Sequence, residues 1–361
     1  MVKAFNVLVI NPGSTSTKIA LYQGAKGEKE VFSKSISHPS EDLAPYPKIA
    51  HQYEFRKAII LEILREHEFP LEKLDAVVGR GGLLRPISGG VYEVNEKMLG
   101  ELKDACYGEH ASNLGGLIAW EIAKDAGCKS YIVDPVVVDE MDDIARFSGN
   151  PLIPRISIFH ALNQKAVARK AAKDLGQHYE DLNLIVAHMG GGISIGMHKK
   201  GRVVDVNNAL DGDGPFSPER SGGVPIGQLV KLCFSGKYTE KEIKDQIKGK
   251  GGLVAYLGTN EGRKVQERIE KGDKKAADVY ASMAYQIAKE IGLLATVVEG
   301  HVDAILLTGG LAYDPKLVSM IEKRVSFIAK VLVFPGEGEM ESLRSGAIRV
   351  LCGEDTAKPY I

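Results

Sequence analysis

The hydrophobic and polar pattern of this chain opens with two strands joined by a tight polar turn. Residues 5–10 are apolar except for Asn6, a pattern that is typical of a strand buried on both faces. Residues 11–13 (Asn, Pro, Gly) supply turn chemistry, and strand-forming residues resume at 18–22. The pattern predicts a strand, a turn and a second strand that runs back beside the first.

A similar pattern begins the second half of the chain, at residues 182–195 (LNLIVAHMGGGISI). Laid on the opening stretch without gaps, Asn11 falls on His188 and Gly13 on Gly190. Two strand–turn–strand units that begin two halves of one chain indicate a duplicated α/β domain.

Other periodic segments fill both halves. Apolar residues at helical spacing predict helices at 52–69, 115–126, 156–175, 278–298 and 342–351. Short apolar runs predict buried strands at 74–78, 130–133, 303–308 and 330–334. Residues 205–225 lack periodicity and are rich in glycine and proline, which favours a long functional loop. We expect one domain from residues 1–150 plus 342–361, to which the last helix returns, and a nucleotide-binding domain from 151–341.

Composition narrows the class of protein. A chain of 361 residues usually forms two domains, and the net charge of −1 gives no electrostatic footprint for nucleic acid or an anionic membrane. No apolar run approaches the ~20 residues that span a bilayer, and the N-terminus does not resemble a signal peptide. The four cysteines are widely spaced, which argues against disulfides and zinc and for a cytoplasmic protein.

Both turns have the chemistry of a phosphate site. The first holds Ser14, Thr15, Ser16 and Thr17 before Lys18, so hydroxyls and an ammonium would join the turn's backbone N–H groups as donors to an anion. The alternative is a hairpin whose hydroxyls satisfy its own turn. The spacing is not that of a Walker loop. In the second turn, glycines 190–192 would let the backbone approach a phosphate closely.

Several charged positions stand beside glycines or at strand ends. Arg80, among glycines, could grip a carboxylate or phosphate, or lie in a surface turn. Asp134 could reach a metal-bound phosphate, or cap the turn that Pro135 enforces. Arg220 lies beside glycines in the long loop. Carboxylates in the GEGEME segment would favour a helix N-terminus. A lone histidine such as His160 is more often satisfied locally than used as a ligand.

Taken together, the motifs resemble one family. N-P-G-S-T-S-T-K, Asp134, F-H-A-L-N-Q, H-M-G-G-G-I-S, R-S-G-G-V-P, L-T-G-G-L-A and G-E-x-E follow in this order over nearly the whole chain. The chain resembles the acetokinase family of short-chain fatty-acid kinases. The resemblance implies two duplicated ribonuclease-H-like domains of the actin-like ATPase class, with a nucleotide cleft between them. Residues 161–164, Gly191 and Gly223 depart from the acetate-kinase pattern and match the branch that acts on butyrate.

The resemblance implies reversible transfer of the γ-phosphoryl group of ATP to a short-chain carboxylate, most closely butyrate, giving an acyl phosphate and ADP with Mg²⁺ as cofactor. The carboxylate is already ionised at pH 7, so no general base is needed. Acetate, propionate or isobutyrate kinases are the alternatives, and from another class a nucleotide-dependent switch on the same fold. The family also suggests a homo-oligomer, a dimer or larger.

Site roles follow from the same resemblance. Arg220 and His160 would hold the transferring group, with Asp134 and Glu339 as further catalytic residues; Glu341 is the alternative to Glu339. The family's substrate-gripping arginine corresponds to Val77 here, and Arg80 is the candidate in its stead, with Phe159 also at the substrate. Metal support is implied for Asp134, Glu339 and Asn11. The residues implied for nucleotide binding are Asn11, Ser14, Ser16, Lys18, His188, Gly190, Gly191, Gly192, Glu261, Gly262, Arg263, Gly309 and Gly310.

Overall fold

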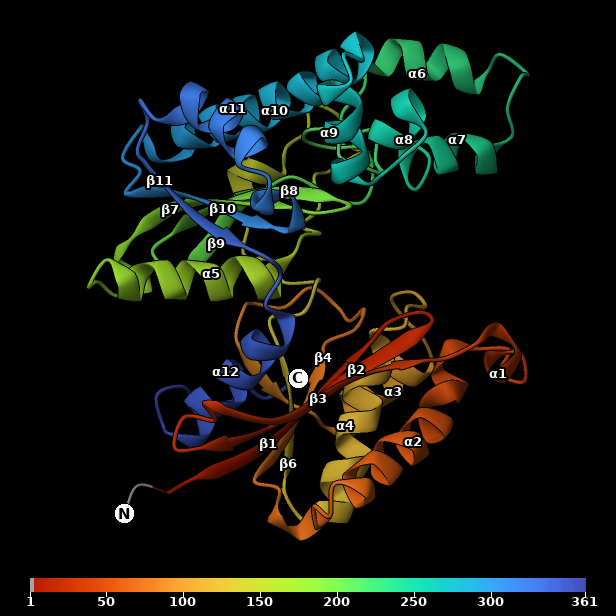
Figure 1. Cartoon of the computed structure of the whole chain (residues 1–361), viewed down its shortest axis with the longest axis vertical. Helices are drawn as coiled ribbons and strands as arrows, with labels where there is room; N and C mark the ends of the chain where they lie inside the picture. Colours follow the sequence, from red (N-terminus) through yellow and green to blue (C-terminus); the bar gives the residue numbers. More distant parts are fainter. Residues whose placement is uncertain (1–2) are drawn as a thin grey trace. The chain divides into compact units, whose positions relative to one another are not determined.

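The computed structural model describes residues 3–361 and divides into two compact units (Figure 1). Unit 1 holds the described residues up to Val138 together with Gly338–Ile361, and unit 2 is Asp139–Glu337. The junctions expected from the sequence lie at residues 150 and 341 instead, and those domain limits stay a prediction. Unit 2 begins early because the segment after Val138 is tied to it: the N–H of Asp142 donates to the carbonyl of Val204 at 2.9 Å.

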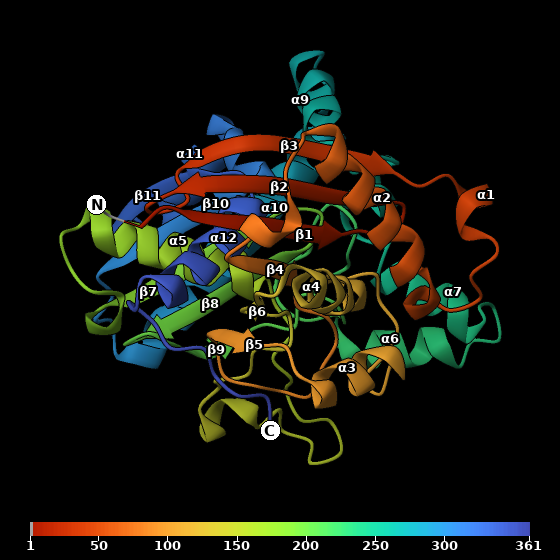
Figure 2. The same ribbon diagram turned by 90° about the horizontal axis from the view of Figure 1, so that it is seen from below.

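Unit 1 is built on a six-stranded sheet in the order β3-β2-β1-β4-β6-β5. β1 pairs antiparallel with β2 and parallel with β4, and β4 pairs parallel with β6. Figure 2 shows the first three strands running side by side. The strands are β1 (Phe5–Pro12), β2 (Ser16–Gly24), β3 (Lys29–Ser37), β4 (Ala76–Arg80), β5 (Val91–Glu93) and β6 (Lys129–Val133).

Helices cover both faces of this sheet. α4 and α2 lie on one face, where Leu8, Ile10 and Val77 of the strands join the core, and α12 contacts the sheet's central strands. The chain's last residues run beside β5, where the N–H of Lys358 donates to Val91. The helices are α1 (Ser40–Leu43), α2 (Tyr53–Glu66), α3 (Glu96–Lys103), α4 (Asn113–Ala126) and α12 (Glu339–Leu351), with 3-10 turns η1 (Ile49–Gln52) and η2 (Leu71–Lys73).

Unit 2 repeats the same plan with five strands, in the order β11-β10-β7-β8-β9. Alternate residues of β7 face opposite layers: Leu184 and Val186 pack toward α5, and Ile185 and Ala187 pack toward α10. The strands are β7 (Asn183–Met189), β8 (Ile193–Lys199), β9 (Arg202–Val206), β10 (Ala304–Gly309) and β11 (Lys330–Pro335).

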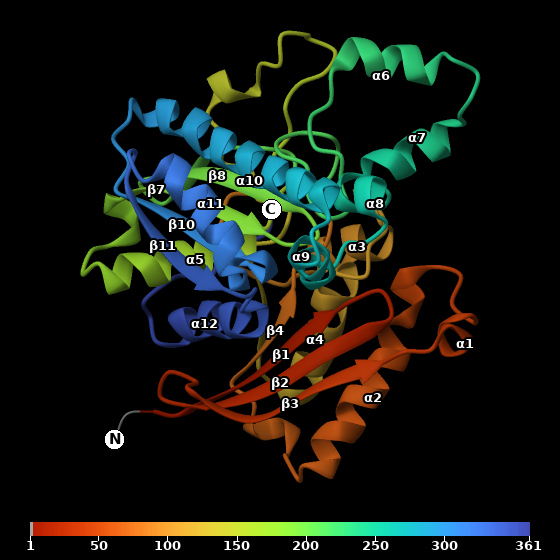
Figure 3. The same cartoon turned by 45° about the horizontal axis from the view of Figure 1, so that its top comes forward.

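The helices of unit 2 form two layers and a helical extension. α10 lies across the sheet beside α11, and α6 and α7 stand beside each other away from α5 (Figure 3). The helices are α5 (Ala161–Asp174), α6 (Ile226–Cys233), α7 (Glu240–Ile247), α8 (Gly252–Leu257), α9 (Gly262–Glu270), α10 (Lys274–Ala295) and α11 (Pro315–Val325), with 3-10 turns η3 (Asp143–Arg146), η4 (Tyr179–Asp181), η5 (Thr296–Val298) and η6 (Gly310–Tyr313).

A repeated polar clasp marks the duplication of the two units. Before β4, the carboxylate of Asp75 accepts from the N–H of Asn6 at 2.8 Å, and before β10 the carboxylate of Asp303 accepts from the N–H of Asn183 at 2.7 Å. In both, the aspartate's own N–H donates back to the asparagine carbonyl. Asn6 and Asn183 are matched by the gap-free superposition of the two sequence stretches, so sequence and structure give the same correspondence.

Two expectations about secondary structure need correction. The helix expected from residue 156 begins at Ala161, because the backbone of His160 has the non-helical dihedrals φ −81° and ψ 62°. The last helix begins at Glu339 rather than at residue 342, so both glutamates of the acidic segment lie in its first turn. Within residues 3–361, no helix is both long enough and apolar enough to cross a bilayer.

Candidate active site

An arginine on α2 holds the first loop, which joins β1 and β2. The guanidinium of Arg56, on α2, donates to the carbonyls of Gly13 at 2.8 Å, Ser16 at 3.0 Å and Ser14 at 3.0 Å. Ser14 and Lys18 are exposed and Ser16 is partly exposed, so the polar groups expected at a ligand are accessible on this loop. The turn is therefore held through its carbonyl groups.

Asn11, Arg80 and Glu339 form one cluster in unit 1. The amide of Asn11 donates to one carboxylate oxygen of Glu339 at 2.6 Å, and the guanidinium of Arg80 lies 2.9 Å from the other. Arg80 also donates weakly to the amide oxygen of Asn11 at 3.4 Å. Glu341, two residues further along α12, is exposed. The structure thus brings together three of the residues expected at the metal or the substrate, with Glu339 rather than Glu341 among them.

Asp134 occupies a strained position at the end of β6. Its φ is +37°, which is costly for a residue with a Cβ, and its side chain is only 1% exposed. Its carboxylate accepts from the N–H of Gly90 at 2.7 Å, and its own N–H donates to the Gly90 carbonyl at 3.0 Å. This pair of bonds fixes the carboxylate at the strand's end.

These oxygen donors fit a magnesium ion. Amide and carboxylate oxygens of Asn11, Asp134 and Glu339 are the hard ligands that Mg²⁺ prefers. Among residues 3–361, no group of three or more His, Cys, Asp or Glu side chains gathers as a metal cage. Mg²⁺ in proteins is usually held by one or two carboxylates together with water and substrate phosphates.

In the second loop, between β7 and β8, carbonyl groups also accept hydrogen bonds from the protein. The carbonyl of Gly191 accepts from the Ser217 hydroxyl at 2.6 Å, and that of Gly192 accepts from the N–H of Gly190 at 3.0 Å. In the described part of the chain, the N–H groups of Gly191 and Gly192 donate no hydrogen bond. They are available to an anion.

Arg220 lies directly against this loop. A Cβ at Gly192 would overlap its guanidinium, so a side chain there would displace Arg220, and the guanidinium also donates to the carbonyl of Ala209. Burial lowers the pKa of Arg220, although the neighbouring Glu219 carboxylate acts in the opposite sense. A partly desolvated guanidinium beside free N–H groups is suited to a phosphoryl group.

His160 and His188 form a stacked pair, with ring centroids 3.9 Å apart and planes inclined by 13°. His160 precedes α5 and its Nδ1 lies 2.8 Å from the hydroxyl of Ser194 on β8. His188, at the end of β7, has its Nδ1 2.7 Å from the amide oxygen of Asn163. Each ring is thus oriented by a hydrogen bond to one nitrogen.

A buried polar chain continues behind Ser194. Gln164 donates to the Ser194 hydroxyl at 2.8 Å, its amide oxygen lies 3.0 Å from Nε2 of His198, and Nδ1 of His198 lies 2.7 Å from the hydroxyl of Tyr179. Burial, followed by the charge of Lys165, lowers the pKa of His198 far below its usual value, so this ring is neutral. This chain of hydrogen bonds fixes the position of the Ser194 hydroxyl, and that hydroxyl orients the ring of His160.

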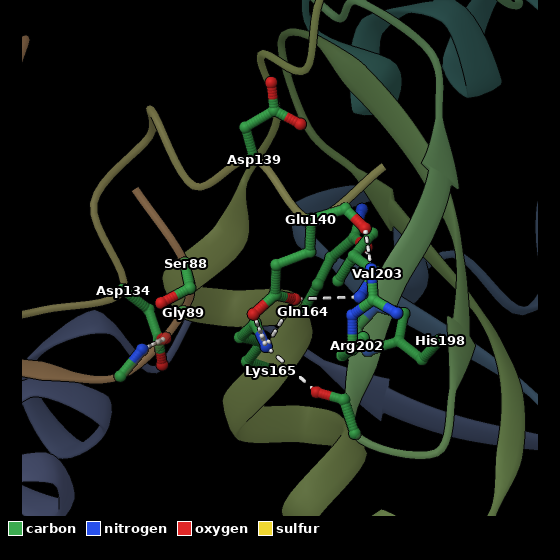
Figure 4. A network of polar contacts seen from close by, with 12 residues as sticks. Ser88, Gly89, Asp134, Asp139, Glu140, Gln164, Lys165, His198, Arg202 and Val203 are labelled. Carbon is green, nitrogen blue, oxygen red and sulfur yellow. Dashed lines mark hydrogen bonds and ion pairs between the residues drawn. The ribbon is translucent and has the colours of Figure 1, made fainter. Parts of the chain in front are cut away.

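A buried ion pair anchors the same helix. The ammonium of Lys165 lies 2.9 Å from the carboxylate of Glu140, which also accepts from the N–H of Val203 at 2.8 Å (Figure 4). Lys165 donates further to the carbonyl of Gly201 at 3.1 Å. This pair ties α5 and β9 to the start of unit 2.

The positions matched to adenosine lie on two neighbouring elements of unit 2. Gly262 begins α9 next to Leu311 of η6, and Gly309 and Gly310 form the end of β10 and the start of η6. Gly309 has φ +87° and its N–H donates to the carbonyl of Gly336 at 3.1 Å. Glu261 and Arg263 are exposed at the start of α9, where Glu261 pairs with Lys264.

Phe159, which was expected at the substrate, is buried in this structure. Its ring is 1% exposed, among the most deeply buried large side chains of the described chain. Arg80, the other residue expected at the substrate, is 36% exposed but paired with Glu339. Both assignments stay predictions.

Sequence reasoning missed the residues that support the site. Arg56 lies at a polar position of a predicted helix, and Asn163, Gln164 and Ser194 appear only as letters of motifs. A buried arginine in a helix has no local signal, since its partners are up to 43 positions away. The one available signal was the departure of residues 161–164 from the acetate-kinase pattern, which marks the helix face where Asn163 and Gln164 lie.

This fold and these loops define a phosphate-binding α/β protein, and comparison with known proteins gives its family. The chain belongs to the acetokinase family, whose family model matches residues 151–340. It is 59% identical to butyrate kinase 2 of Clostridium acetobutylicum over 356 residues, 99% of each chain, and 57% identical to butyrate kinase 1 of the same organism over 99% of each.

Solved structures show the fold. The acetate kinase of Porphyromonas gingivalis superposes with a TM-score of 0.77, covering 96% of this chain and 99% of that one, at 20% identity. The expected fold class, two related α/β units of the actin-like ATPase kind, is therefore confirmed.

Proposed function

We propose that this chain is a butyrate kinase, an enzyme that transfers the γ-phosphoryl group of ATP reversibly to butyrate and forms butanoyl phosphate and ADP. The observation that carries the proposal is the 59% identity to a protein named butyrate kinase over 99% of both chains. The geometry supports the chemistry, because loops with free N–H groups, a partly buried arginine and an oriented histidine are what phosphoryl transfer needs.

The residues divide the work between the two units. Arg220 and His160 would hold the oxygens of the transferring group, and His188 with the backbone of residues 190–192 would bind the nucleotide phosphates. Asn11, Asp134 and Glu339 would hold Mg²⁺, which when bound supplies neutralisation of charge on the phosphates. Ser14, Ser16 and Lys18 would support the phosphates from the first loop.

The remaining roles concern the base, the sugar and the acid. Residues 261–263, 309 and 310 would bind adenosine, where the glycines leave room for a flat ring. Arg80 would bind the carboxylate of the acid, which requires its guanidinium to share or exchange the Glu339 contact. Phe159 would shape the acyl pocket once its surface becomes accessible.

The test is an assay of acyl phosphate formation, trapped as the hydroxamate, across acetate, propionate, butyrate, isobutyrate, valerate and hexanoate. We expect the highest kcat/KM with butyrate and a fall of about 10-fold or more for acetate, since each methylene contributes about 1–3 kcal/mol. A maximum at another acid would reassign the substrate, and no acyl phosphate with any acid would refute the kinase.

A homo-oligomer is part of the proposal. Large apolar side chains are exposed on α6 and directly after it, with Ile226 76% and Phe234 87% exposed, and none of the eight residues of α6 is buried. Apolar surface of this kind usually marks an interaction site. Sedimentation equilibrium should give at least a dimer, and Phe234→Glu should reduce the mass; a monomeric parent protein would contradict it.

We also place the enzyme in the cytoplasm. Cys106, Cys233 and Cys352 are exposed and Cys128 is partly buried, all four as free thiols. Exposed free thiols suit a reducing compartment. Fractionation of cells that produce the native protein checks this.

A further inference from the structure

The first loop rests on a buried cation. The side chain of Arg56 is 1% exposed, and its guanidinium reaches three carbonyls of the loop, the hydroxyl of Thr17 at 3.0 Å and the amide oxygen of Gln52 at 2.8 Å. Every one of these partners is neutral. The guanidinium of Arg56 therefore makes its five hydrogen bonds to neutral oxygen atoms and none of these five to a carboxylate.

No carboxylate balances this charge. Across residues 3–361, no Asp or Glu forms an ion pair with Arg56. Burial lowers the pKa of Arg56 to about 10, which still leaves it protonated at neutral pH. Burying an unpaired charge is costly, so a protein that keeps one usually gains from it elsewhere.

The loop's backbone is polarised by these contacts. The carbonyls of Gly13, Ser14 and Ser16 accept from Arg56, and that of Thr15 accepts from the N–H of His38 at 2.8 Å. Within the described residues, the N–H groups of Ser14 and Thr15 donate no hydrogen bond. Four consecutive carbonyls are bound, and the N–H groups between them are left for an external acceptor, which is the arrangement of an anion-binding nest.

We propose that Arg56 is a positioning residue for phosphate binding: it fixes the carbonyl side of the loop so that the N–H and hydroxyl side meets the nucleotide phosphates, and these phosphates supply the negative charge that Arg56 lacks in the free protein. The inference rests on the proposed use of this loop for ATP. Arg56 touches no substrate itself and acts through the loop.

The competing explanation is that Arg56 only holds the fold together. The two explanations differ in what they predict for ligands with and without phosphate. If Arg56 positions the loop, its replacement should weaken binding of MgATP and leave adenosine binding unchanged, because the residues proposed for adenosine belong to unit 2 and Arg56 supports a loop of unit 1. If Arg56 serves only the fold, its replacement should weaken the binding of neither ligand, or of both ligands to the same extent.

Three variants measured by isothermal titration calorimetry separate these outcomes, with MgATP and adenosine as the probes. Arg56→Met removes the charge and should weaken MgATP binding about 10- to 100-fold, while Arg56→Lys should recover part of the loss, because charge-assisted hydrogen bonds are directional. Arg65→Met, at an exposed arginine on the same helix, is the matched control and should bind both ligands as the parent does.

Gln52→Glu tests the charge alone. It places a carboxylate at the atom that Arg56 already contacts, so the hydrogen bonds remain and the folded protein is kept or stabilised, but the positive charge under the loop is neutralised. We expect MgATP binding about tenfold weaker with adenosine unaffected. Unchanged MgATP affinity in this variant would overturn the proposal, even if Arg56→Met did not fold.

Failure of this inference is distinguishable from failure of the kinase proposal. The kinase proposal is decided by acyl phosphate formation in the parent protein, and the role of Arg56 by the ratio of MgATP to adenosine affinities without any acid present. A parent protein that makes acyl phosphate while Gln52→Glu binds MgATP normally refutes Arg56 only.

Discussion

At the scale of single residues, Arg220 is the side chain whose replacement should affect chemistry most. Its guanidinium lies against Gly192 and bonds the Ala209 carbonyl, so its position is fixed by the loop. We expect Arg220→Ala to lower kcat about 10³- to 10⁵-fold, as for arginines that stabilise phosphoryl transfer. The hydroxamate assay measures this, with circular dichroism to verify folding. The exposed Arg324→Ala should keep the parent kcat, and near-normal turnover of Arg220→Ala would remove it from the mechanism.

Ser194 should matter through His160. Ser194→Ala removes the hydroxyl that lies 2.8 Å from Nδ1 of His160 and leaves the Gln164 amide without that acceptor. We expect a cost of about 1–2 kcal/mol in unfolding free energy, and a kcat decrease larger than any change in MgATP affinity. Urea unfolding and steady-state kinetics on one preparation test both. If MgATP affinity fell as much as kcat, Ser194 would serve binding rather than orientation of His160.

The sequence predicted which polar residues lie together better than which residues support them. Asn11 and Glu339 were expected together from motifs 328 positions apart, and the structure joins them by a 2.6 Å hydrogen bond. Arg56 could not be predicted, because helix periodicity scores an arginine as solvent-facing and its burial depends on a loop 40 residues earlier.

At the scale of elements, the two adjacent glycines at the junction of β10 and η6 should respond differently to substitution. Gly309 has φ +87°, and a Cβ there would overlap the backbone of Met189, whereas a Cβ on Gly310 meets nothing within 4 Å. Gly309→Ala should therefore cost about 2–3 kcal/mol of unfolding free energy, from strain plus overlap. Gly310→Ala should keep stability and weaken nucleotide binding, because its methyl group would enter the proposed base site.

Urea unfolding and adenosine titration of both glycine variants provide the test. Equal stability of the two would contradict the strain at Gly309. An unchanged adenosine affinity of Gly310→Ala would move the base site away from η6.

Elements were predicted from sequence where their apolar pattern was strong. The central strands β1, β4, β7 and β10 consist mainly of buried apolar residues and were expected within a few residues. β3 was missed because it is an edge strand with only Phe32 buried and lysines and a glutamate along it. The pattern reports burial, so an exposed strand gives no signal.

At the scale of the whole molecule, one design appears twice. Each unit presents a β-hairpin loop whose carbonyls accept hydrogen bonds from the protein and two of whose N–H groups donate none within residues 3–361. In each unit the strand before the loop is joined to its parallel neighbour by an Asn–Asp pair. The two loops differ in the means: an arginine binds the first, and a serine hydroxyl with a glycine N–H binds the second. Duplication preserved the backbone arrangement while its support changed.

Stability of the whole molecule should depend on pH through Glu290, a partly buried carboxyl on α10. Burial, followed by the charge of Asp213, raises its pKa from 4.5 to about 7; Asp205 acts in the same sense, and Arg155 and Lys289 oppose it. Between pH 4.5 and 7 the folded protein therefore binds a proton that the unfolded chain has released. Stability should fall as pH rises through this range and level off above it.

Glu290→Gln removes this dependence. At pH 5 the variant and the parent should unfold at similar urea concentrations, because this pH is only just above the unfolded pKa of 4.5 and little of the destabilisation has yet developed. At pH 8 the variant should be more stable by about 2 kcal/mol, less than the full shift of the pKa would give because the group is partly solvated. Circular dichroism during urea unfolding at both pH values measures the difference, with Glu267→Gln on the exposed face of α9 as control. A stability difference that does not grow from pH 5 to pH 8 would show that the Glu290 carboxyl is ionised without cost, and that α10 admits water at this position.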